Sequence, residues 1–241
     1  MAPIAVITAV PREMALLEAA LERPAVCSDG PVTLICGEIG TVPVVLAVGG
    51  IGKVNAALAA ALLIERFKPS LVISTGCAGA YPGSGMSVGD LALARDEVQG
   101  DEGVITSRGW LDLHGMGFPL VTCSSGSFYN RFPLSTVFRE KAGATARRQG
   151  IDLREGTFIT VSTCSGTLQR GEELEQRFGA IAENMEGAAI AQVCLRYGVE
   201  CLEVRGISNM VEERNMNAWD IPLAVDAAQR FVLELIRGEA S

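Results

Sequence analysis

The chain has 241 residues, of which 49% are apolar and 20% are charged. The 28 Asp and Glu residues outnumber the 20 Lys and Arg residues, so the formal net charge is −8. The apolar content excludes a disordered chain, and the acidic balance argues against nucleic acid or an anionic membrane as a partner, because both select for basic surfaces. This length fits one large domain, which we expect to span residues 1–241.

The N-terminal residues lack a basic region followed by a long apolar run, and no segment is apolar enough to span a membrane. The seven cysteines are scattered and form no Cys-x-x-Cys pair, which predicts neither a zinc site nor a disulfide framework. We therefore expect reduced cysteines, no bound metal and a cytoplasmic protein.

Short apolar runs alternate with longer helical patterns along the chain. Residues 3–9 predict a buried strand, and residues 11–22 predict a helix with Pro11 in its first turn. Further strands are expected at 32–38, 42–48, 71–75, 90–98, 157–162 and 202–207, with helices at 53–67, 170–178, 185–198 and 217–237. The middle, 100–150, is rich in Gly, Ser and aromatic residues and is the least regular part; it is either a long functional insertion or a region whose elements the pattern does not resolve. This order predicts a single-domain α/β fold, a mixed twisted sheet flanked by helices.

Familiar catalytic patterns are incomplete or absent. The glycines of 49–52 do not form a P-loop, because Ala47 and Val54 stand where that motif needs Gly and Ser or Thr. No Gly-x-Ser-x-Gly elbow occurs. The single histidine, His114, lies in the irregular middle, which argues against a Ser-His-Asp triad.

Polar residues at strand ends are the remaining candidates. Glu13 lies just after the first strand, where a sheet of this kind opens its ligand crevice, although the helix dipole alone also favours an acid there. Glu186 stands beside a strongly apolar helix, where a carboxylate needs a partner such as a sugar hydroxyl or the helix start itself. Ser208 and Asn209 end a buried strand and are equally compatible with a simple turn.

Five segments, at 8–13, 49–57, 74–79, 184–187 and 208–209, occur together in this order. They resemble the motifs of the purine nucleoside phosphorylase/nucleosidase superfamily, and most closely its hydrolytic branch. The resemblance implies a nucleoside phosphorylase-like fold and a purine N-glycosidase that needs no cofactor. It also implies a small nucleoside as the substrate and a homodimer or higher homo-oligomer.

The resemblance assigns catalytic roles to Glu13, as the base that activates water, and to Asn209, at the leaving purine. It assigns substrate binding to Cys77, Ala78, Gly79, Thr167, Asn184, Met185, Glu186 and Ser208, with Glu186 on the ribose hydroxyls. These roles suit a reaction with an oxocarbenium-like transition state and a purine that gains negative charge. A carboxylate at position 13 would repel phosphate, which favours hydrolysis over phosphorolysis.

Asn209 departs from the branch members that cleave adenine nucleosides, which carry aspartate there. An amide N–H can donate to the 6-oxo group of hypoxanthine, whereas a carboxylate would face its lone pairs. Segments 100–103, 130–134, 183–187 and 205–209 resemble the group that cleaves futalosine in menaquinone biosynthesis and releases hypoxanthine. The alternatives are an inosine-type or methylthioadenosine/S-adenosylhomocysteine nucleosidase, and a non-catalytic nucleoside sensor.

The futalosine-cleaving group binds a substrate with a carboxylated aromatic group at its 5′ end. The segment 101–135 is rich in aromatic residues, so Arg108, Trp110, Phe128 and Arg131 are candidates for this 5′ pocket. The alternative is that these aromatic residues form the core of an irregular region. Residues 162–168 hold no aromatic side chain, although related enzymes stack one on the base there.

Overall fold

Strand β1 (Ile4–Thr8) shows how the sheet is buried in this computed structural model, which describes residues 1–28 and 30–239. Ile4 and Val6 pack in one hydrophobic cluster, and Ala5 and Ile7 pack in another on the opposite face. Successive side chains of a strand point to opposite faces, so an entirely apolar strand needs cover on both sides. The sheet is therefore the middle layer of the molecule.

The large sheet combines parallel and antiparallel pairs. Its strand order is β11-β6-β12-β13-β5-β1-β4-β3-β2, and β14 pairs with both β5 and β6. Besides β1, its strands are β2 (Glu22–Ser28), β3 (Leu34–Ile39), β4 (Val42–Val48), β5 (Leu71–Ala80), β6 (Leu91–Gln99), β11 (Arg131–Pro133), β12 (Leu153–Thr160), β13 (Ala180–Asn184) and β14 (Glu200–Met210). Because β14 joins β5 to β6, the strands β5, β14, β6, β12 and β13 close into a ring.

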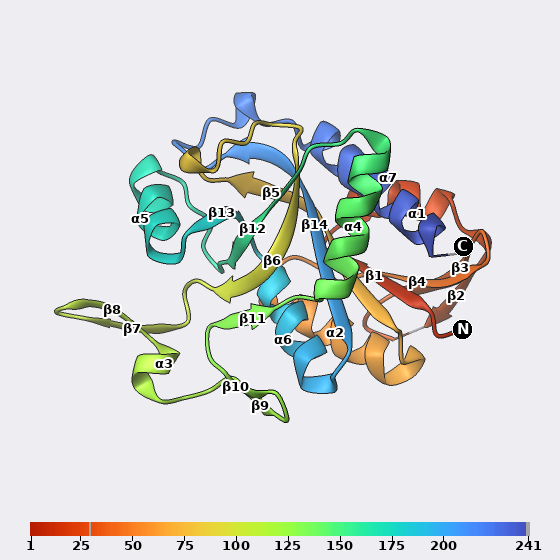
Figure 1. Ribbon diagram of the computed structural model, residues 1–241, viewed down its shortest axis with the longest axis horizontal. Helices are drawn as coiled ribbons and strands as arrows, with labels where there is room; N and C mark the ends of the chain where they lie inside the picture. The colour runs from red at the N-terminus through yellow and green to blue at the C-terminus, as the bar shows by residue number, and fades with distance from the viewer. Residues whose placement is uncertain (29, 240–241) are drawn as a thin grey trace.

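Helices cover both faces of this sheet (Figure 1). On one side lie α2 (Lys53–Phe67) and α6 (Gly187–Tyr197), and on the other lie α1 (Ala15–Ala19), α4 (Thr136–Gln149) and α7 (Ile221–Gly238). Helix α5 (Leu168–Phe178) packs on β13, and α3 (Leu113–Met116) follows an outlying hairpin. Among the described residues, none of these helices is long and apolar enough to cross a membrane.

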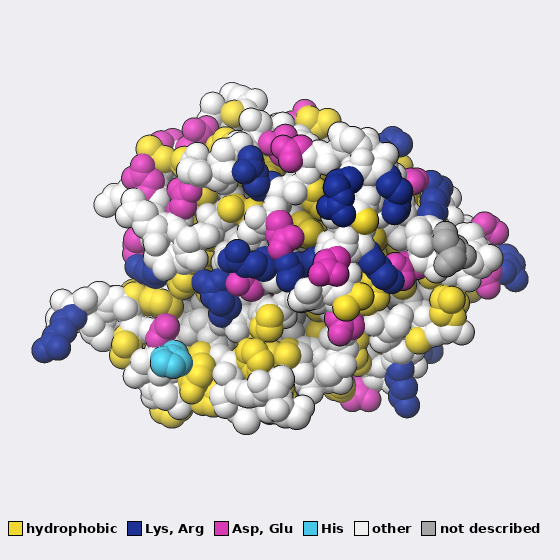
Figure 2. Space-filling model, in the orientation of Figure 1, with side chains coloured by type: hydrophobic (Ala, Val, Ile, Leu, Met, Phe, Trp, Pro, Cys, Tyr) yellow, Lys and Arg dark blue, Asp and Glu magenta, His cyan; other side chains and the backbone are white. Residues whose placement is uncertain are grey.

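Two small hairpins extend from the body. They are formed by β7 (Gly103–Thr106) with β8 (Gly109–Asp112), and by β9 (Val121–Cys123) with β10 (Gly126–Phe128). Figure 1 shows the β7–β8 hairpin projecting furthest, and Figure 2 shows the same arm standing clear of the surface. On this face, basic and acidic side chains are interspersed (Figure 2).

The predicted α/β fold is confirmed, but the middle of the chain is more regular than the sequence indicates. Of the two interpretations of 100–150, the one in which the pattern leaves its elements unresolved fits, because α4 and the two hairpins lie there. Helix α4 buries only a narrow strip, Ala142, Thr145 and Ala146, which leaves a weak apolar pattern. The expected helix at 11–22 is a 3₁₀ turn, Pro11–Glu13, followed by the short α1, and Glu22 already begins β2.

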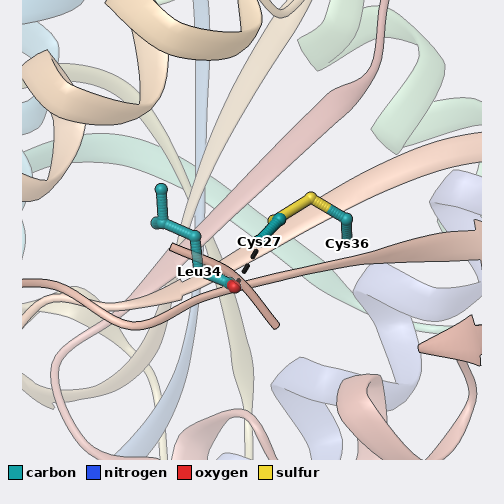
Figure 3. Close-up of a disulfide and its surroundings, with 3 residues drawn as sticks. All are labelled: Cys27, Leu34 and Cys36. Atoms are coloured by element: carbon teal, nitrogen blue, oxygen red, sulfur yellow. Dashed lines mark hydrogen bonds between the residues drawn. A yellow bond between two sulfur atoms is a disulfide. The ribbon is translucent and has the colours of Figure 1, made fainter. Parts of the chain in front are cut away.

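A disulfide joins Cys27 of β2 to Cys36 of β3, so the expectation that all cysteines are reduced is wrong (Figure 3). Antiparallel pairing of these strands places Ala25 opposite Cys36, and the two cysteine Cα atoms lie 6.0 Å apart. The carbonyl oxygen of Leu34 lies 3.4 Å from the Cys27 sulfur, as a contact, because a bridged sulfur carries no proton. The sequence pattern does not predict this bridge. Strand β2 contains Pro24 and is mostly exposed, so no clear strand pattern surrounds Cys27.

Candidate active site

A cavity of about 540 Å³ opens where β1, β5, β13 and β14 end. The carboxyl ends of strands are the usual ligand crevice of an α/β sheet. Its lining residues are Ala9, Val10, Pro11, Arg12, Glu13, Ile51, Cys77, Ala78, Gly79, Cys164, Ser165, Glu183, Asn184, Met185, Glu186, Arg205, Ser208, Asn209, Arg214, Trp219 and Ile221. A larger groove of about 700 Å³, between α4 and α7, contains none of the motif residues.

Glu13 is buried at the wall of the cavity, with 3% of its surface exposed. Its Oε2 accepts hydrogen bonds from the backbone N–H groups of Ala9 (3.1 Å) and Val10 (3.2 Å). Its Oε1 accepts a hydrogen bond from the N–H of Cys77 at 2.9 Å. Three backbone donors from two strand ends therefore fix the carboxylate without using any side chain.

Glu186 follows β13 and is held from the other side of the cavity. Its Oε1 accepts a hydrogen bond of 2.9 Å from the N–H of Gly52, the last residue of the glycine motif before α2. Its Oε2 lies 3.6 Å from the guanidinium of Arg205. Burial raises the pKa of Glu186 above its ordinary value of 4.5, and this outweighs the opposite effects of Arg205 and the Gly52 N–H.

Arg205 is a buried cation behind the cavity, with 2% of its surface exposed. Its Nε donates to Glu203 at 2.8 Å, and its terminal nitrogens donate to the Cys77 carbonyl and the Ser74 hydroxyl, each at 3.3 Å. Burial acts to lower the pKa of Arg205, but the carboxylates of Glu203, Glu186 and Glu13 raise it. Arg205 therefore stays charged and partly compensates these acids.

The Asn184 side chain organises the turn into α6. Its Oδ1 accepts hydrogen bonds from the N–H groups of Glu186 (2.9 Å) and Gly187 (2.7 Å). Its Nδ2 donates to Glu97 at 2.5 Å. With these groups satisfied, Asn184 orients the backbone of Glu186 and leaves Met185 at the cavity wall.

Asn209 stands at the end of β14, next to Ser208. The hydroxyl of Ser208 lies 2.8 Å from the Asn209 Oδ1, to which it can donate, and the Asn209 Nδ2 donates to the Met210 carbonyl at 3.1 Å. An amide nitrogen carries two hydrogens, so one N–H of Asn209 is left for a ligand. The neighbouring Cys77 stays a neutral thiol, because burial and the Glu13 carboxylate raise its pKa to about 12.

The structure brings most of the sequence-predicted site residues to this one cavity. Glu13, Asn209, Ser208 and the segments 77–79 and 184–186 all line it. Thr167 does not; its side chain caps the start of α5, where it accepts from the N–H of Arg170.

The residues expected to form the 5′ pocket do not line this cavity. Trp110, Phe128 and Arg131 line a second cavity of about 530 Å³, and Arg108 lies in the exposed turn of the β7–β8 hairpin. Arg131 instead forms an ion pair with Asp96, with 2.9 Å between the guanidinium nitrogen and the carboxylate oxygen. Trp110 packs edge-on against Phe178. Sequence pattern identified the aromatic residues but not the cavity on which they converge.

Sequence reasoning missed Arg214 and Trp219, which lie in the loop between β14 and α7 and line the first cavity. The guanidinium of Arg214 lies 5.0 Å from the centre of the Trp219 ring. Trp219 is the only ring among the described lining residues, so it is the available aromatic surface. No group of three His, Cys, Asp or Glu side chains in residues 1–28 and 30–239 is arranged to hold a metal.

Comparisons with known proteins agree with this geometry. Residues 3–237 match the Phosphorylase superfamily. The chain is 37% identical over 190 residues to the futalosine hydrolase of Thermus thermophilus, covering 79% of this chain and 80% of that protein. It is 33% identical over 238 residues to the 5′-methylthioadenosine/S-adenosylhomocysteine nucleosidase of Maridesulfovibrio salexigens, covering 97% of this chain and 98% of that protein.

A solved structure shows the same relationship in three dimensions. The 5′-methylthioadenosine/S-adenosylhomocysteine nucleosidase of Neisseria meningitidis, in complex with methylthio-immucillin-A, has a TM-score of 0.86 at 27% identity. The comparison covers 99% of this chain and 100% of that chain. The chain therefore belongs to the phosphorylase superfamily, as its five motifs predicted. Within that superfamily it is a nucleosidase, an enzyme that hydrolyses an N-glycosidic bond.

Proposed function

We propose that this nucleosidase hydrolyses futalosine, releasing hypoxanthine and dehypoxanthine futalosine. The observation that carries the proposal is an amide, Asn209, in the cavity that holds Glu13 and Glu186. The Ser208 hydroxyl can donate to one lone pair of the Asn209 Oδ1, and the remaining N–H of Asn209 complements the acceptors N7 and O6 of hypoxanthine. Adenine offers that N–H only N7, because its 6-amino group is a donor and two donors cannot pair.

Glu13 is the general base of the proposed reaction. Three backbone N–H groups fill three of the four acceptor sites of its carboxylate, so the remaining site, on Oε1, is available to a water molecule in the cavity. It takes a proton from this water as the water oxygen bonds to C1′. The bond from C1′ to N9 breaks, and the electron pair leaves with the purine, where the Asn209 N–H stabilises the developing charge.

Glu186 binds the ribose hydroxyls in this scheme. An ionised carboxylate accepts hydrogen bonds from two vicinal hydroxyls, and its negative charge also stabilises the positive charge that develops on the sugar. Arg205 holds this carboxylate on the side away from the sugar. Met185 supplies apolar contact beside it.

The 5′ group of futalosine ends in an aromatic carboxylate. Arg214 and Trp219 provide a cation and an aromatic face inside the catalytic cavity, and Ile221 adds apolar surface. We assign the 5′ group to this pair in preference to Arg108 and Arg131, which lie outside the cavity.

A second candidate is 5′-methylthioadenosine/S-adenosylhomocysteine nucleosidase activity. It is favoured by the relative from Maridesulfovibrio salexigens, which matches 97% of this chain. The two candidates differ at position 6 of the base and at the 5′ substituent, so substrates that change one position at a time separate them.

The decisive experiment measures kcat/KM for futalosine, its 6-amino analogue, inosine and adenosine, and adds 5′-methylthioadenosine. We expect kcat/KM for futalosine to exceed that for its 6-amino analogue about tenfold or more, because a mispaired buried polar group costs about 1–3 kcal/mol. The kcat/KM for futalosine should also exceed that for inosine, which lacks the 5′ group. A preference for 5′-methylthioadenosine over futalosine would overturn the proposal in favour of the second candidate.

The 5′ assignment is tested with Arg214→Ala and a matched control, Arg108→Ala. Removing the cation should reduce kcat/KM for futalosine about tenfold and leave inosine unchanged, since a charge-assisted hydrogen bond contributes roughly 1.5–3 kcal/mol. Arg108→Ala should change neither value. If Arg108→Ala alone reduces futalosine cleavage, the hairpin and not Arg214 reads the 5′ group.

Glu13→Gln tests the chemical step. The variant should lose about 10²–10⁴-fold in kcat, as expected for a general base, while nucleoside affinity changes little. Glu18→Gln is the control, because Glu18 lies on the exposed side of α1. Near-wild-type turnover in Glu13→Gln would exclude Glu13 as the base.

We further propose that the enzyme acts in menaquinone biosynthesis, as a homodimer or higher homo-oligomer. An apolar strip on and just before α2 supports self-association: Ile51, Val54 and Leu58 are 58%, 83% and 42% exposed. Val54→Asp should convert the wild-type oligomer to a monomer in size-exclusion chromatography with light scattering. A monomeric wild type would contradict this part of the proposal.

A further inference from the structure

Two buried carboxyl groups, Glu97 of β6 and Glu203 of β14, meet beneath the cavity. Each has a fully buried side chain, with 0% exposure. A Cβ atom at Gly187 would lie 2.2 Å from Oε1 of Glu97 and 2.2 Å from Oε2 of Glu203. Only glycine at the start of α6 leaves room for the two carboxyl groups to face each other.

Hydrogen bonding leaves one atom of this pair without a partner. Glu203 Oε1 accepts from the Nε of Arg205 at 2.8 Å, but Glu203 Oε2 is buried and has no donor among the described residues. Glu97 accepts from Asn184 at 2.5 Å and from the Thr160 hydroxyl at 2.8 Å. An orphaned buried carboxylate oxygen beside a second carboxyl group needs a proton between them, because two adjacent like charges repel.

We propose that Glu97 carries a proton that it donates to Glu203, and that this pair is a positioning device for Glu186. Glu203 is the ionised member, because Arg205 binds it directly. Glu97 is the neutral member, because its other contacts are with the uncharged Asn184 and Thr160. In agreement, burial and the neighbouring Glu203 raise the pKa of Glu97 well above its ordinary value.

Two chains of contacts run from the pair to Glu186, one made of hydrogen bonds and one that ends in an ion pair. On one side, Glu97 holds Asn184, whose Oδ1 receives the backbone N–H of Glu186. On the other side, Glu203 holds Arg205, whose guanidinium lies 3.6 Å from the Glu186 carboxylate. The shared proton closes these chains into a loop, so both the backbone and the carboxylate of Glu186 are fixed by one pair. The inference uses the proposed function only for its kinetic readout.

The protonation state is measured without substrate, by ¹³C-NMR of protein labelled at glutamate carboxyl carbons. At neutral pH we expect one carboxyl carbon with the chemical shift of a protonated acid, absent from Glu97→Gln. It should persist in Glu183→Gln, the matched control, because Glu183 is also buried but accepts three hydrogen bonds, from Tyr81 and from the N–H and hydroxyl of Ser165. Absence of a protonated signal in the wild type, or its survival in Glu97→Gln, would overturn the proposal.

The positioning role is measured by rescue. Glu97→Leu leaves the Asn184 Nδ2 and the Glu203 Oε2 without a partner. It should reduce kcat about hundredfold with a smaller change in KM, because misplacing a substrate-holding group impairs the reacting geometry. Glu97→Gln keeps a neutral donor toward Glu203, so it should restore kcat to within about tenfold of the wild type. If Glu97→Gln is as slow as Glu97→Leu, position 97 needs a charge and the proposal fails.

The experiments distinguish an incorrect substrate assignment from an incorrect Glu97–Glu203 assignment. If futalosine is not the substrate, the NMR result still stands, and kcat is measured on whichever nucleoside the wild type cleaves. If Glu97→Leu does not fold, the labelled wild type and Glu97→Gln still decide the protonation state.

Discussion

Glu13 and Cys77, which are 64 residues apart in the chain, are joined by a hydrogen bond of 2.9 Å from the Cys77 N–H to Glu13 Oε1. The bond connects the 3₁₀ turn after β1 to the C-terminal part of β5, and β1 and β5 are neighbouring parallel strands. It exists because Gly76 has no side chain: a Cβ there would lie 2.4 Å from the same oxygen. The position of the carboxylate that we propose as the general base thus depends on a glycine in another strand.

Gly76→Ala should therefore displace Glu13 while leaving the fold intact. A displacement of about 1 Å at a catalytic group costs about hundredfold in rate, and we expect kcat to fall by that amount. The control is Gly143→Ala in α4, where the nearest atom to a new Cβ is 3.4 Å away. Turnover is measured beside far-ultraviolet circular dichroism; a Gly76→Ala kcat close to the wild type would show that Glu13 tolerates the methyl group.

The sequence predicts the centre of the site because its residues follow strand ends. Glu13, Cys77, Glu186 and Asn209 each stand near the end of a different strand, and neighbouring strands in one sheet bring such ends together. Pattern and resemblance therefore predict side chains that the structure brings to one cavity.

The features that the sequence does not predict depend on contacts between residues that follow no helical or strand periodicity. The Glu97–Glu203 pair joins β6 to β14, and its charges resemble ordinary surface acids in the sequence. Arg214 and Trp219 lie in an irregular loop, where neither strand nor helix spacing places a side chain. The Cys27–Cys36 bridge requires β2, an exposed edge strand whose apolar alternation is weak.

The free cysteines should differ in reactivity. The pKa of Cys77 is raised to about 12 by burial and by Glu13, whereas hydrogen bonds with Ser125 lower the pKa of Cys123. The thiolate is the reactive form, so iodoacetamide at a pH of about 8 should label Cys123 well before Cys77. Peptide mass spectrometry over a time course gives both rates, and Cys123→Ser serves as the control. Equal labelling of the two residues would contradict the raised pKa of Cys77.

Glu186→Gln should separate stability from activity. Because burial raises the pKa of Glu186 above 4.5, folding favours its protonated form. That contribution to stability is present below the unfolded pKa and is lost as the pH rises through the folded pKa. Glutamine resembles the protonated acid, so the thermal midpoint of Glu186→Gln should exceed that of the wild type at neutral pH, with the difference vanishing in acid.

Activity should respond in the opposite direction, since ionised Glu186 is the form that accepts ribose hydroxyls. Wild-type kcat/KM should fall as the pH decreases through the raised pKa of Glu186, above 4.5. Glu186→Gln should be almost inactive throughout. Thermal melts and pH–rate profiles are compared with those of the exposed-site control Glu172→Gln; a variant that is less stable than the wild type at neutral pH would show that ionised Glu186 stabilises the fold.

Asn209→Asp tests how the base is read. The substitution replaces an N–H donor with an ionised oxygen, which would face O6 of hypoxanthine and accept from a 6-amino group. We expect kcat/KM for futalosine to fall about tenfold to hundredfold, since a mispaired buried polar group costs about 1–3 kcal/mol, and cleavage of the 6-amino analogue to rise. Asn217→Asp makes the same chemical change on the exposed loop and should leave both values as they are. Because the two nucleosides share the 5′ group and the ribose, their ratio isolates position 6, and a ratio that stays constant in Asn209→Asp would mean that another group recognises the base.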